Sequence, residues 1–127
     1  MEMVIKRFAR CGRALHGRLL IDGEHVCDTL ENAVCCLPPG RYLVRASVRR
    51  RAVGALCATS PFVRFVASNG PCQLGEGDIA LGECRYLGFL IHTQENRVPV
   101  IDRVRKATSR HKTVTVIILP DDDGFFV

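Results

Sequence analysis

The sequence contains no tryptophan, and aromatic residues make up only 6% of it. Proteins that hold single-stranded nucleic acid without sequence preference stack the bases on aromatic side chains set among basic ones. No aromatic residue interleaves the basic clusters of this chain, so we expect no stacking platform. Zinc-finger spacing and a glycine-rich phosphate loop, which would indicate nucleic-acid or nucleotide binding directly, are also missing.

Long apolar runs and an export signal are missing as well. No stretch approaches the roughly 18 consecutive apolar residues of a membrane-spanning helix, so we predict no membrane span. A secretory signal has a basic start followed by an uninterrupted apolar run. Here Lys6, Arg7 and Arg10 fall inside the first apolar stretch, so we expect a cytoplasmic protein.

The seven cysteines include no pair with CxxC spacing. In a chain that is not exported, such cysteines are typically reduced and serve as small apolar residues. A zinc site would need ligands that converge from scattered loops, so we predict no metal and no cofactor. If the chain were secreted, a disulfide framework with one spare thiol would be the better interpretation.

Length, composition and charge are those of one globular domain. The 127 residues are 47% hydrophobic and 24% charged, which allows a packed core, and we predict a single domain over residues 1–127. The net charge of +5 is compatible with an acidic partner but does not require one.

Stretches with strand-like content lie between turn signals along the chain, and residues 41–48 alternate well between apolar and polar side chains. Asp22-Gly23 predicts a hairpin over residues 14–31, because a type I′ turn needs positive φ at both central positions. Neither face of the second strand of this hairpin is cleanly apolar, which leaves its register open. Further strands are expected at residues 3–8, 41–48, 78–82, 86–92 and 113–119, and a loop at 49–60. Residues 61–67 form another apolar run, which turn signals follow.

One helix is predicted at residues 96–107, where apolar residues recur on one helical face. Pro99 fits only a first turn, so the helix should begin near Asn96, a good N-cap. We therefore predict a mainly β (α+β) fold, which is a small, mostly antiparallel barrel or curled sheet with one C-terminal helix.

Several motifs follow one another in a characteristic order along residues 3–107. They are Gly17, Leu19, Asp22-Gly23, Cys27, Thr29-Leu30-Glu31, Leu37-Pro38-Pro39-Gly40-Arg41-Tyr42, Gly77-Asp78-Ile79-Ala80-Leu81-Gly82 and Asp102-Arg103-Val104-Arg105-Lys106-Ala107. In this order they resemble a bacterial and phage family designated domain of unknown function 5675. The resemblance implies a fold and a phage or mobile-element setting but no established activity. The C-terminal strand and tail at residues 108–127 lie outside it.

Many members of that family carry an Ile-His-x-Gly-Asn stretch ahead of a Gly-Cys-Ile-x-x-Gly stretch. A histidine near a cysteine is a plausible pair of base and nucleophile, and it resembles the pair of peptidoglycan transpeptidases. In this chain Val66 stands at the histidine position and Asp78 at the cysteine position. If the pair is catalytic in relatives, the resemblance implies that this chain has lost it.

Cys84 and His92, with Asp78, are the candidate catalytic residues that remain. Cys84 precedes Arg85, and His92 ends the next expected strand, so a thiol could meet a base there. The simpler interpretation is a turn cysteine and a histidine that closes a strand.

Two basic clusters are candidate phosphate contacts. The first consists of Arg45, Arg49, Arg50 and Arg51, and the second of Arg103, Arg105, Lys106, Arg110 and Lys112. The simpler interpretation is a solvated face together with charge at a helix end.

Three classes of function stay open. We favour a non-catalytic binding or accessory protein of phage or mobile-element origin. The alternatives are a cell-wall-related Cys/His enzyme fold with a degenerate site, and a weak nucleic-acid binder acting through its arginines. The expected partner is accordingly a protein or a nucleic acid, and not a membrane.

Overall fold

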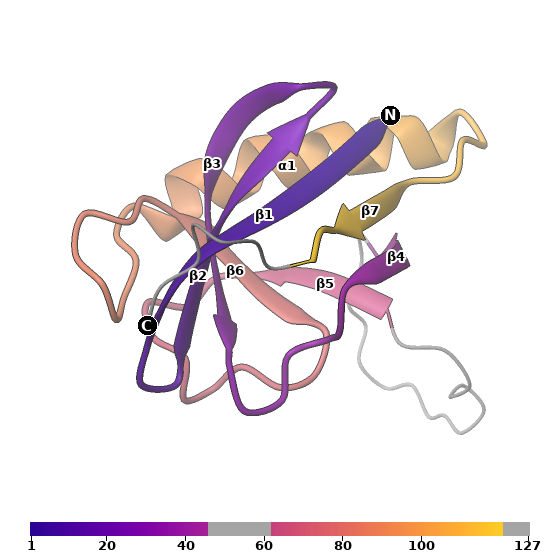
Figure 1. Ribbon diagram of the computed structural model, residues 1–127. Coiled ribbons are helices and arrows are strands. Elements are labelled where there is room, and N and C mark those ends of the chain that lie inside the picture. The colour runs from indigo at the N-terminus through magenta and orange to yellow at the C-terminus, as the bar shows by residue number, and fades with distance from the viewer. Residues whose placement is uncertain (46–61, 121–127) are drawn as a thin grey trace.

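The computed structural model describes residues 1–45 and 62–120. In order, the elements within them are β1 (Glu2–Cys11), β2 (Ala14–Ile21), β3 (Glu24–Asn32), β4 (Gly40–Arg45), β5 (Phe62–Val66), β6 (Asp78–Gly82), α1 (Thr93–Ser109) and β7 (Thr115–Ile118) (Figure 1). The end of the strand expected at 41–48 and the loop expected at 49–60 lie outside the described residues.

The strands close into a barrel in the order β1-β2-β3-β6-β5-β4-β7, with β7 pairing back onto β1. Within residues 1–45 and 62–120, the expected small β barrel with one C-terminal helix is therefore confirmed. The meander β1-β2-β3 and the pairs β3–β6 and β4–β7 are antiparallel. The pairs β1–β7, β4–β5 and β5–β6 are parallel, which local sequence patterns cannot indicate because these strands are not joined by tight turns.

The hairpin around Asp22-Gly23 is confirmed. Asp22 has φ of 49° and Gly23 φ of 89°, the two positive values that a type I′ turn requires. The structure explains why the sequence pattern did not decide the register of β3. Both faces of the end of this strand are covered, so neither face is distinctly polar. Thr29 and Glu31 are buried on one face and Leu30 on the other.

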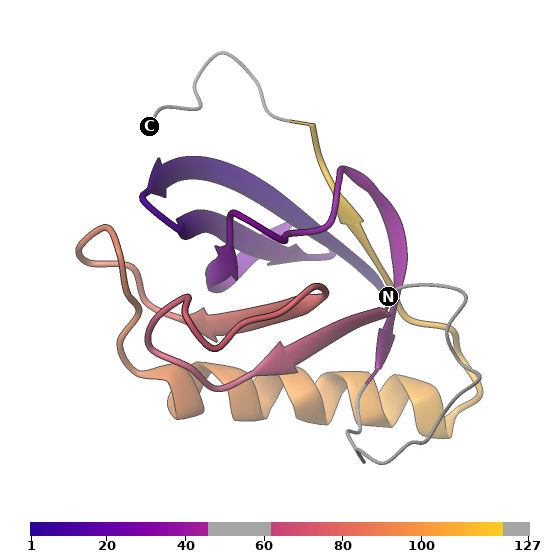
Figure 2. The same cartoon turned by 90° about the horizontal axis from the view of Figure 1, so that it is seen from below.

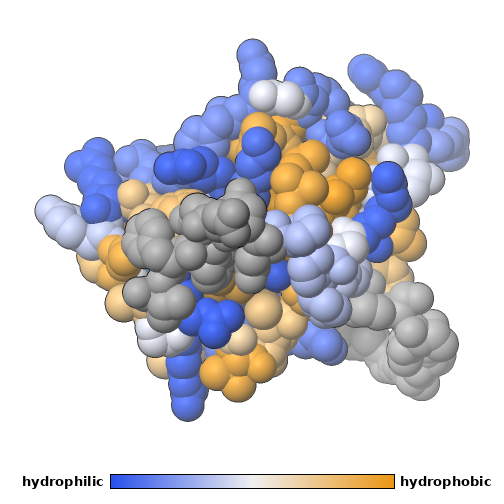
Figure 3. Space-filling model, in the orientation of Figure 1, coloured by the Kyte–Doolittle hydropathy of each residue, from blue (hydrophilic) through white to orange (hydrophobic). Residues whose placement is uncertain are grey.

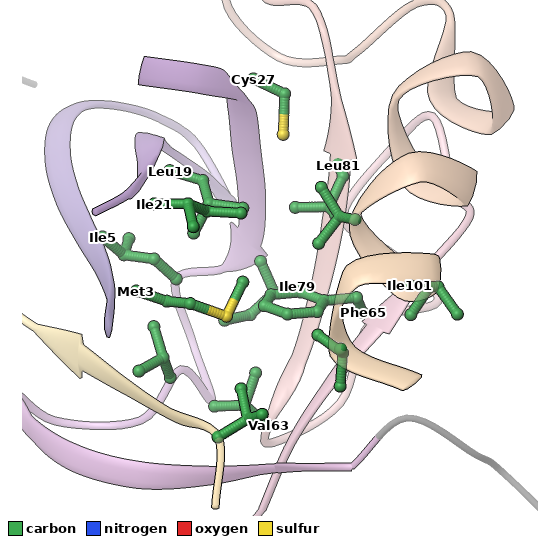
Figure 4. Close-up of a cluster of buried hydrophobic side chains, with 14 of the residues drawn as sticks. Met3, Ile5, Leu19, Ile21, Cys27, Val63, Phe65, Ile79, Leu81 and Ile101 are labelled. Atoms are coloured by element: carbon green, nitrogen blue, oxygen red, sulfur yellow. The ribbon is translucent and has the colours of Figure 1, made fainter. Parts of the chain in front are cut away.

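Two apolar clusters account for this double burial. The larger one joins inward-facing strand residues to Val100, Ile101 and Val104 of α1, which runs along the β5–β6 side of the barrel (Figures 2 and 4). The smaller one contains Leu30 with side chains from the loops that follow β5 and β6. Its buried members are Ala14, Leu30, Leu74, Ala80 and Leu90.

The strand expected at residues 86–92 is wrong. Only one isolated bridge, between Glu83 and Ile91, forms there, and the rest of the segment is a loop. Gly88 has φ of 110° and breaks any extended run. Of the apolar residues in this segment, Tyr86, Leu87 and Phe89 are exposed on the loop, and Leu90 is buried.

The helix begins at Thr93 and not near Asn96, so the expected start is wrong. Pro99 lies inside the helix on an exposed position, where water can satisfy the carbonyl that loses its N–H partner. Within residues 1–45 and 62–120, no helix is both long and apolar enough to cross a membrane.

Candidate functional site

The loop between Glu83 and Ile91, here called the aromatic loop, is anchored firmly at its base. Glu83 and Ile91 exchange two backbone hydrogen bonds of 2.8 and 3.0 Å. Leu90 is buried, and its N–H donates to the carbonyl of Asn69 at 2.8 Å. The Asn69 side-chain amide donates back to the carbonyl of Leu90, also at 2.8 Å. The loop therefore leaves the barrel from a defined position.

The tip of the aromatic loop displays apolar side chains to solvent. Tyr86, Leu87 and Phe89 are 68%, 42% and 41% exposed. The rings of Tyr86 and Phe89 stack on one another, with centroids 6.0 Å apart and planes 21° apart. Two of the few aromatic residues of the chain are thus held together outside the core.

A buried histidine supports the middle of this loop. His16 on β2 is fully buried, and the N–H of Gly88 donates to its Nε2 at 2.8 Å. Nε2 therefore carries no proton, so the proton of the neutral ring is on Nδ1. Nδ1 is buried without a hydrogen-bond partner among the described residues. Burial lowers the pKa of His16, and the charge of Asp28 opposes this only in part, so the ring stays neutral.

Beside His16, the outer face of the β1–β2 hairpin extends the apolar surface. The Phe8 ring lies 6.2 Å from the His16 ring, measured between centroids. The Arg18 guanidinium sits 4.6 Å from the centroid of Phe8, a cation–π contact. We call the set formed by the half-buried Phe8 and the exposed Arg18, Tyr86, Leu87 and Phe89 the aromatic patch.

Cys84 lies in the aromatic loop but has the environment of an unreactive thiol. Its N–H donates to Asp28 Oδ2 at 2.8 Å, and its Sγ donates to the carbonyl of Tyr86 at 3.7 Å. Burial raises the pKa of Cys84, and the charge of Asp28 raises it further, against a smaller lowering by Arg18. A reactive cysteine needs the opposite shift, because the thiolate is the nucleophile.

His92 follows the aromatic loop and precedes α1. It has φ of 54°, in the left-handed region, and its Nδ1 lies 3.4 Å from Glu95 Oε2. Cys84 and His92 each come one residue after a member of the antiparallel Glu83–Ile91 bridge. Because the two segments run in opposite directions, these steps carry Cys84 and His92 away from each other.

Asp78, at the start of β6, serves the neighbouring strand and turn. It pairs with Arg64 of β5 at 2.6 Å and accepts the N–H of Gly75 at 2.9 Å. The three candidates therefore have different partners. Cys84 bonds to Asp28, His92 to Glu95, and Asp78 to Arg64. No hydrogen bond joins any two of these three candidates within the part of the chain that the structure describes.

Most of the first basic cluster lies outside the described residues. Arg49, Arg50 and Arg51 fall in the undescribed segment, and of Arg45 only the backbone, which ends β4, is described. The prediction for this cluster thus stays a prediction.

Sequence reasoning missed His16 and the buried ion pair between Arg7 and Glu31. Arg7 Nη2 lies 2.7 Å from Glu31 Oε1, and both side chains are almost fully buried. For His16 a signal existed, because it stands in a strand of the hairpin that is otherwise mostly apolar. The Arg7–Glu31 pair joins β1 to β3 through the barrel, which no local pattern indicates.

No metal site emerges from the described residues. Nowhere in residues 1–45 and 62–120 do three or more His, Cys, Asp or Glu side chains gather closely enough to hold an ion. The cysteines that the structure describes are free thiols, and burial raises the pKa of Cys27 to about 12.

No protein-family model, curated protein or solved structure matches this chain. Its function is therefore inferred from its own residues, and the aromatic patch is the most distinctive surface feature among them.

Proposed function

We propose that the protein is a non-catalytic binding domain that engages a protein partner through the aromatic patch. The observation that carries this proposal is the exposed, stacked pair of Tyr86 and Phe89 on a loop anchored at its base and at Gly88. Aromatic side chains and arginine dominate the binding energy of protein interfaces, because they bury a large area with few rotatable bonds.

Pre-organisation supports the same conclusion. An interface loop that must be ordered on binding loses part of its affinity to conformational entropy. Here Leu90 is buried and Gly88 is held on His16, so the display of Tyr86 and Phe89 is set before a partner arrives. Exposed apolar clusters of this kind are characteristic of interaction sites.

The chemistry of the patch also defines the partner. The two stacked rings and Leu87 favour an apolar pocket on the partner, and Arg18, which lies over the Phe8 ring, favours a carboxylate on the rim of that pocket. We therefore expect a protein surface with an apolar pocket that has acidic residues on its rim. The phage or mobile-element setting rests on the family resemblance of residues 3–107 alone.

The enzyme alternative finds less support. A cysteine nucleophile requires a thiolate, and the pKa of Cys84 is raised by burial and by Asp28. The hydrogen bonds of Cys84 and His92 go to different neighbours, so within the described residues His92 is not bonded to the thiol that it would have to activate.

Paired surface variants test the proposal. The wild-type chain, a Tyr86→Ser/Phe89→Ser variant and a Val34→Ser control are used in parallel to capture proteins from a bacterial lysate. Val34 is 74% exposed in the turn after β3. Its replacement by serine therefore also removes an exposed apolar side chain, but outside the aromatic patch. A protein retained by the wild type and the control is then purified, and its Kd is measured for all three chains.

We expect the double variant to bind this purified protein about ten-fold more weakly or worse, because two hot-spot rings are removed. The control should bind like the wild type. Equal Kd values for all three chains, or no protein that depends on the rings, would contradict the proposal. Unchanged thermal unfolding of the variants shows that the loss is local.

A further inference from the structure

The second basic cluster converges on one surface, at the end of α1 that is remote from the aromatic loop. Four of its five residues border a shallow depression where the end of α1 meets the start of β1. The residues that line it are Met1, Asp22, Arg103, Lys106, Ala107, Arg110 and Lys112. We call this surface the basic depression. Figure 3 shows hydrophilic side chains projecting along the edge of the molecule where α1 ends.

Among the described residues, no ion pair neutralises the charges of the basic depression. Arg103, Lys106, Arg110 and Lys112 form no ion pair with any residue that the structure describes. Asp22 is the one acidic residue in the lining, and its Oδ1 already accepts the N–H of Glu2 at 3.1 Å. Four cations so close together repel one another, and a bound anion would relieve that repulsion.

The spacing of these cations favours an extended anion. Arg103, Lys106 and Arg110 follow one another at i, i+3 and i+7, so they share one face at the end of α1. At a rise of about 1.5 Å per residue, this row is roughly 10 Å long. That length is comparable with a few successive phosphates of one DNA strand, which lie about 3.4 Å apart along the helix axis.

We propose that the basic depression binds the phosphodiester backbone of nucleic acid, independently of base sequence. The only apolar lining residues are Met1 and Ala107, too little to insert into a lipid surface. No aromatic side chain lines the depression, so bases have nothing to stack on, and the contacts are to phosphates. The net charge of +5 assists the approach of such a polyanion.

This site is separate from the aromatic patch. The aromatic loop ends just before the first turn of α1, and the basic depression lies along the last turns of that helix. Arg103 and Arg110 follow Thr93 by ten and seventeen residues, so the depression lies roughly 15 to 25 Å along the helix from the aromatic loop. A protein partner and a nucleic acid can therefore be held at the same time, and the two proposals can fail separately.

The test measures binding of a fluorescent DNA duplex of about 20 base pairs by anisotropy, at salt concentrations from about 50 to 200 mM. The variants are Arg103→Glu and Arg110→Glu, with Arg105→Glu as a matched control. Arg105 is exposed on the same helix and undergoes the same change of charge, but it does not line the depression.

We expect Arg103→Glu and Arg110→Glu each to weaken binding about ten-fold at low salt. Each should also make the slope of log K against log salt shallower by about 1, because one phosphate contact is lost. Arg105→Glu should lower the affinity much less and leave the slope unchanged. Equal effects of all three variants, or no salt-dependent binding by the wild type, would overturn the proposal.

A second arm uses vesicles that contain an anionic phospholipid. Binding to these vesicles that is lost in Arg103→Glu and Arg110→Glu, without binding to the duplex, would assign the depression to a lipid surface and overturn the nucleic-acid proposal. Duplex binding without vesicle binding supports it.

Discussion

At the residue scale, the most informative side chain is His16. A buried imidazole that accepts a backbone N–H can do so only while it is neutral, since protonation of Nε2 would remove the acceptor. The charged groups near it are Asp28, which raises its pKa, and Arg18, which lies over the neighbouring Phe8 ring. Burial outweighs Asp28, so the anchoring of Gly88 persists at neutral pH.

This environment predicts how stability depends on pH. Because the pKa of His16 is lower in the folded chain than its ordinary value of 6.5, the unfolded chain takes up the proton first as pH falls. The contribution of His16 is therefore complete above about pH 7 and is lost as pH falls through 6.5 towards the folded pKa, by at most about 1.4 kcal/mol per pH unit.

The variant His16→Gln separates this effect from the titration of carboxylates. Its side-chain oxygen can still accept the N–H of Gly88, but it cannot be protonated. We expect urea unfolding from about pH 7 to pH 5 to show a smaller loss of stability for the variant than for the wild type. The same pH dependence in both proteins would show that His16 does not titrate on unfolding.

At the scale of elements, α1 forms although it contains an internal proline, Pro99. Val100, Ile101 and Val104 pack against the barrel, while Pro99 faces solvent. Packing of the apolar face thus outweighs the intrinsic cost of the proline. The helix extends to Thr93 because Asn96 bonds back to the His92 carbonyl through both its backbone N–H, at 3.3 Å, and its side-chain amide, at 2.8 Å.

Replacement of Pro99 by alanine should stabilise the protein. A proline inside a helix destabilises the folded state by about 3 kcal/mol. Its removal also makes the unfolded chain more flexible, which lowers the stability by up to about 1 kcal/mol. We expect a net gain of about 2 kcal/mol in the free energy of unfolding, measured by urea denaturation. Val98→Ala, at an exposed position next to it, serves as the control and should change stability little. Destabilisation by Pro99→Ala would mean that the proline sets the path of the helix.

At the scale of the whole molecule, one buried ion pair connects distant parts of the barrel. Arg7 on β1 donates to Glu31 on β3 at 2.7 and 3.0 Å, and to the carbonyl of Leu37, ahead of β4, at 2.7 Å. Three segments that are far apart in the chain are thereby joined inside the fold. Removing one member of such a pair is strongly destabilising, because the other member remains buried with an uncompensated charge.

The variant Glu31→Gln should accordingly be strongly destabilised. The amide keeps one acceptor oxygen but removes the negative charge that faces the buried Arg7 guanidinium. We expect the free energy of unfolding to fall by about 3 kcal/mol in denaturant titrations. Glu24→Gln, on the exposed start of the same strand, should change it by less than about 0.5 kcal/mol. If the two variants lost similar amounts of stability, the Arg7–Glu31 ion pair would not be a main contributor to the stability of the barrel.

The sequence predicted a good part of this arrangement. Turn chemistry located the hairpin at Asp22-Gly23, and apolar spacing located β6 and the packed face of α1, because these signals are local. It failed at residues 86–92, where a short apolar run indicated a strand but a loop forms, with Tyr86, Leu87 and Phe89 exposed. It also could not show that Cys84 and His92 bond to different partners, since that depends on the path of the loop between them.

By itself, the amino-acid sequence determined the class of the fold, the hairpin and the helix, since alternation, turn residues and helical spacing act over a few neighbouring positions. Only the tertiary structure decided which distant strands pair in parallel and where the barrel closes. It also decided that Gly88 rests on His16 and that Arg103, Lys106, Arg110 and Lys112 border one depression. These features join residues far apart in the chain, and packing of the whole chain brings them together.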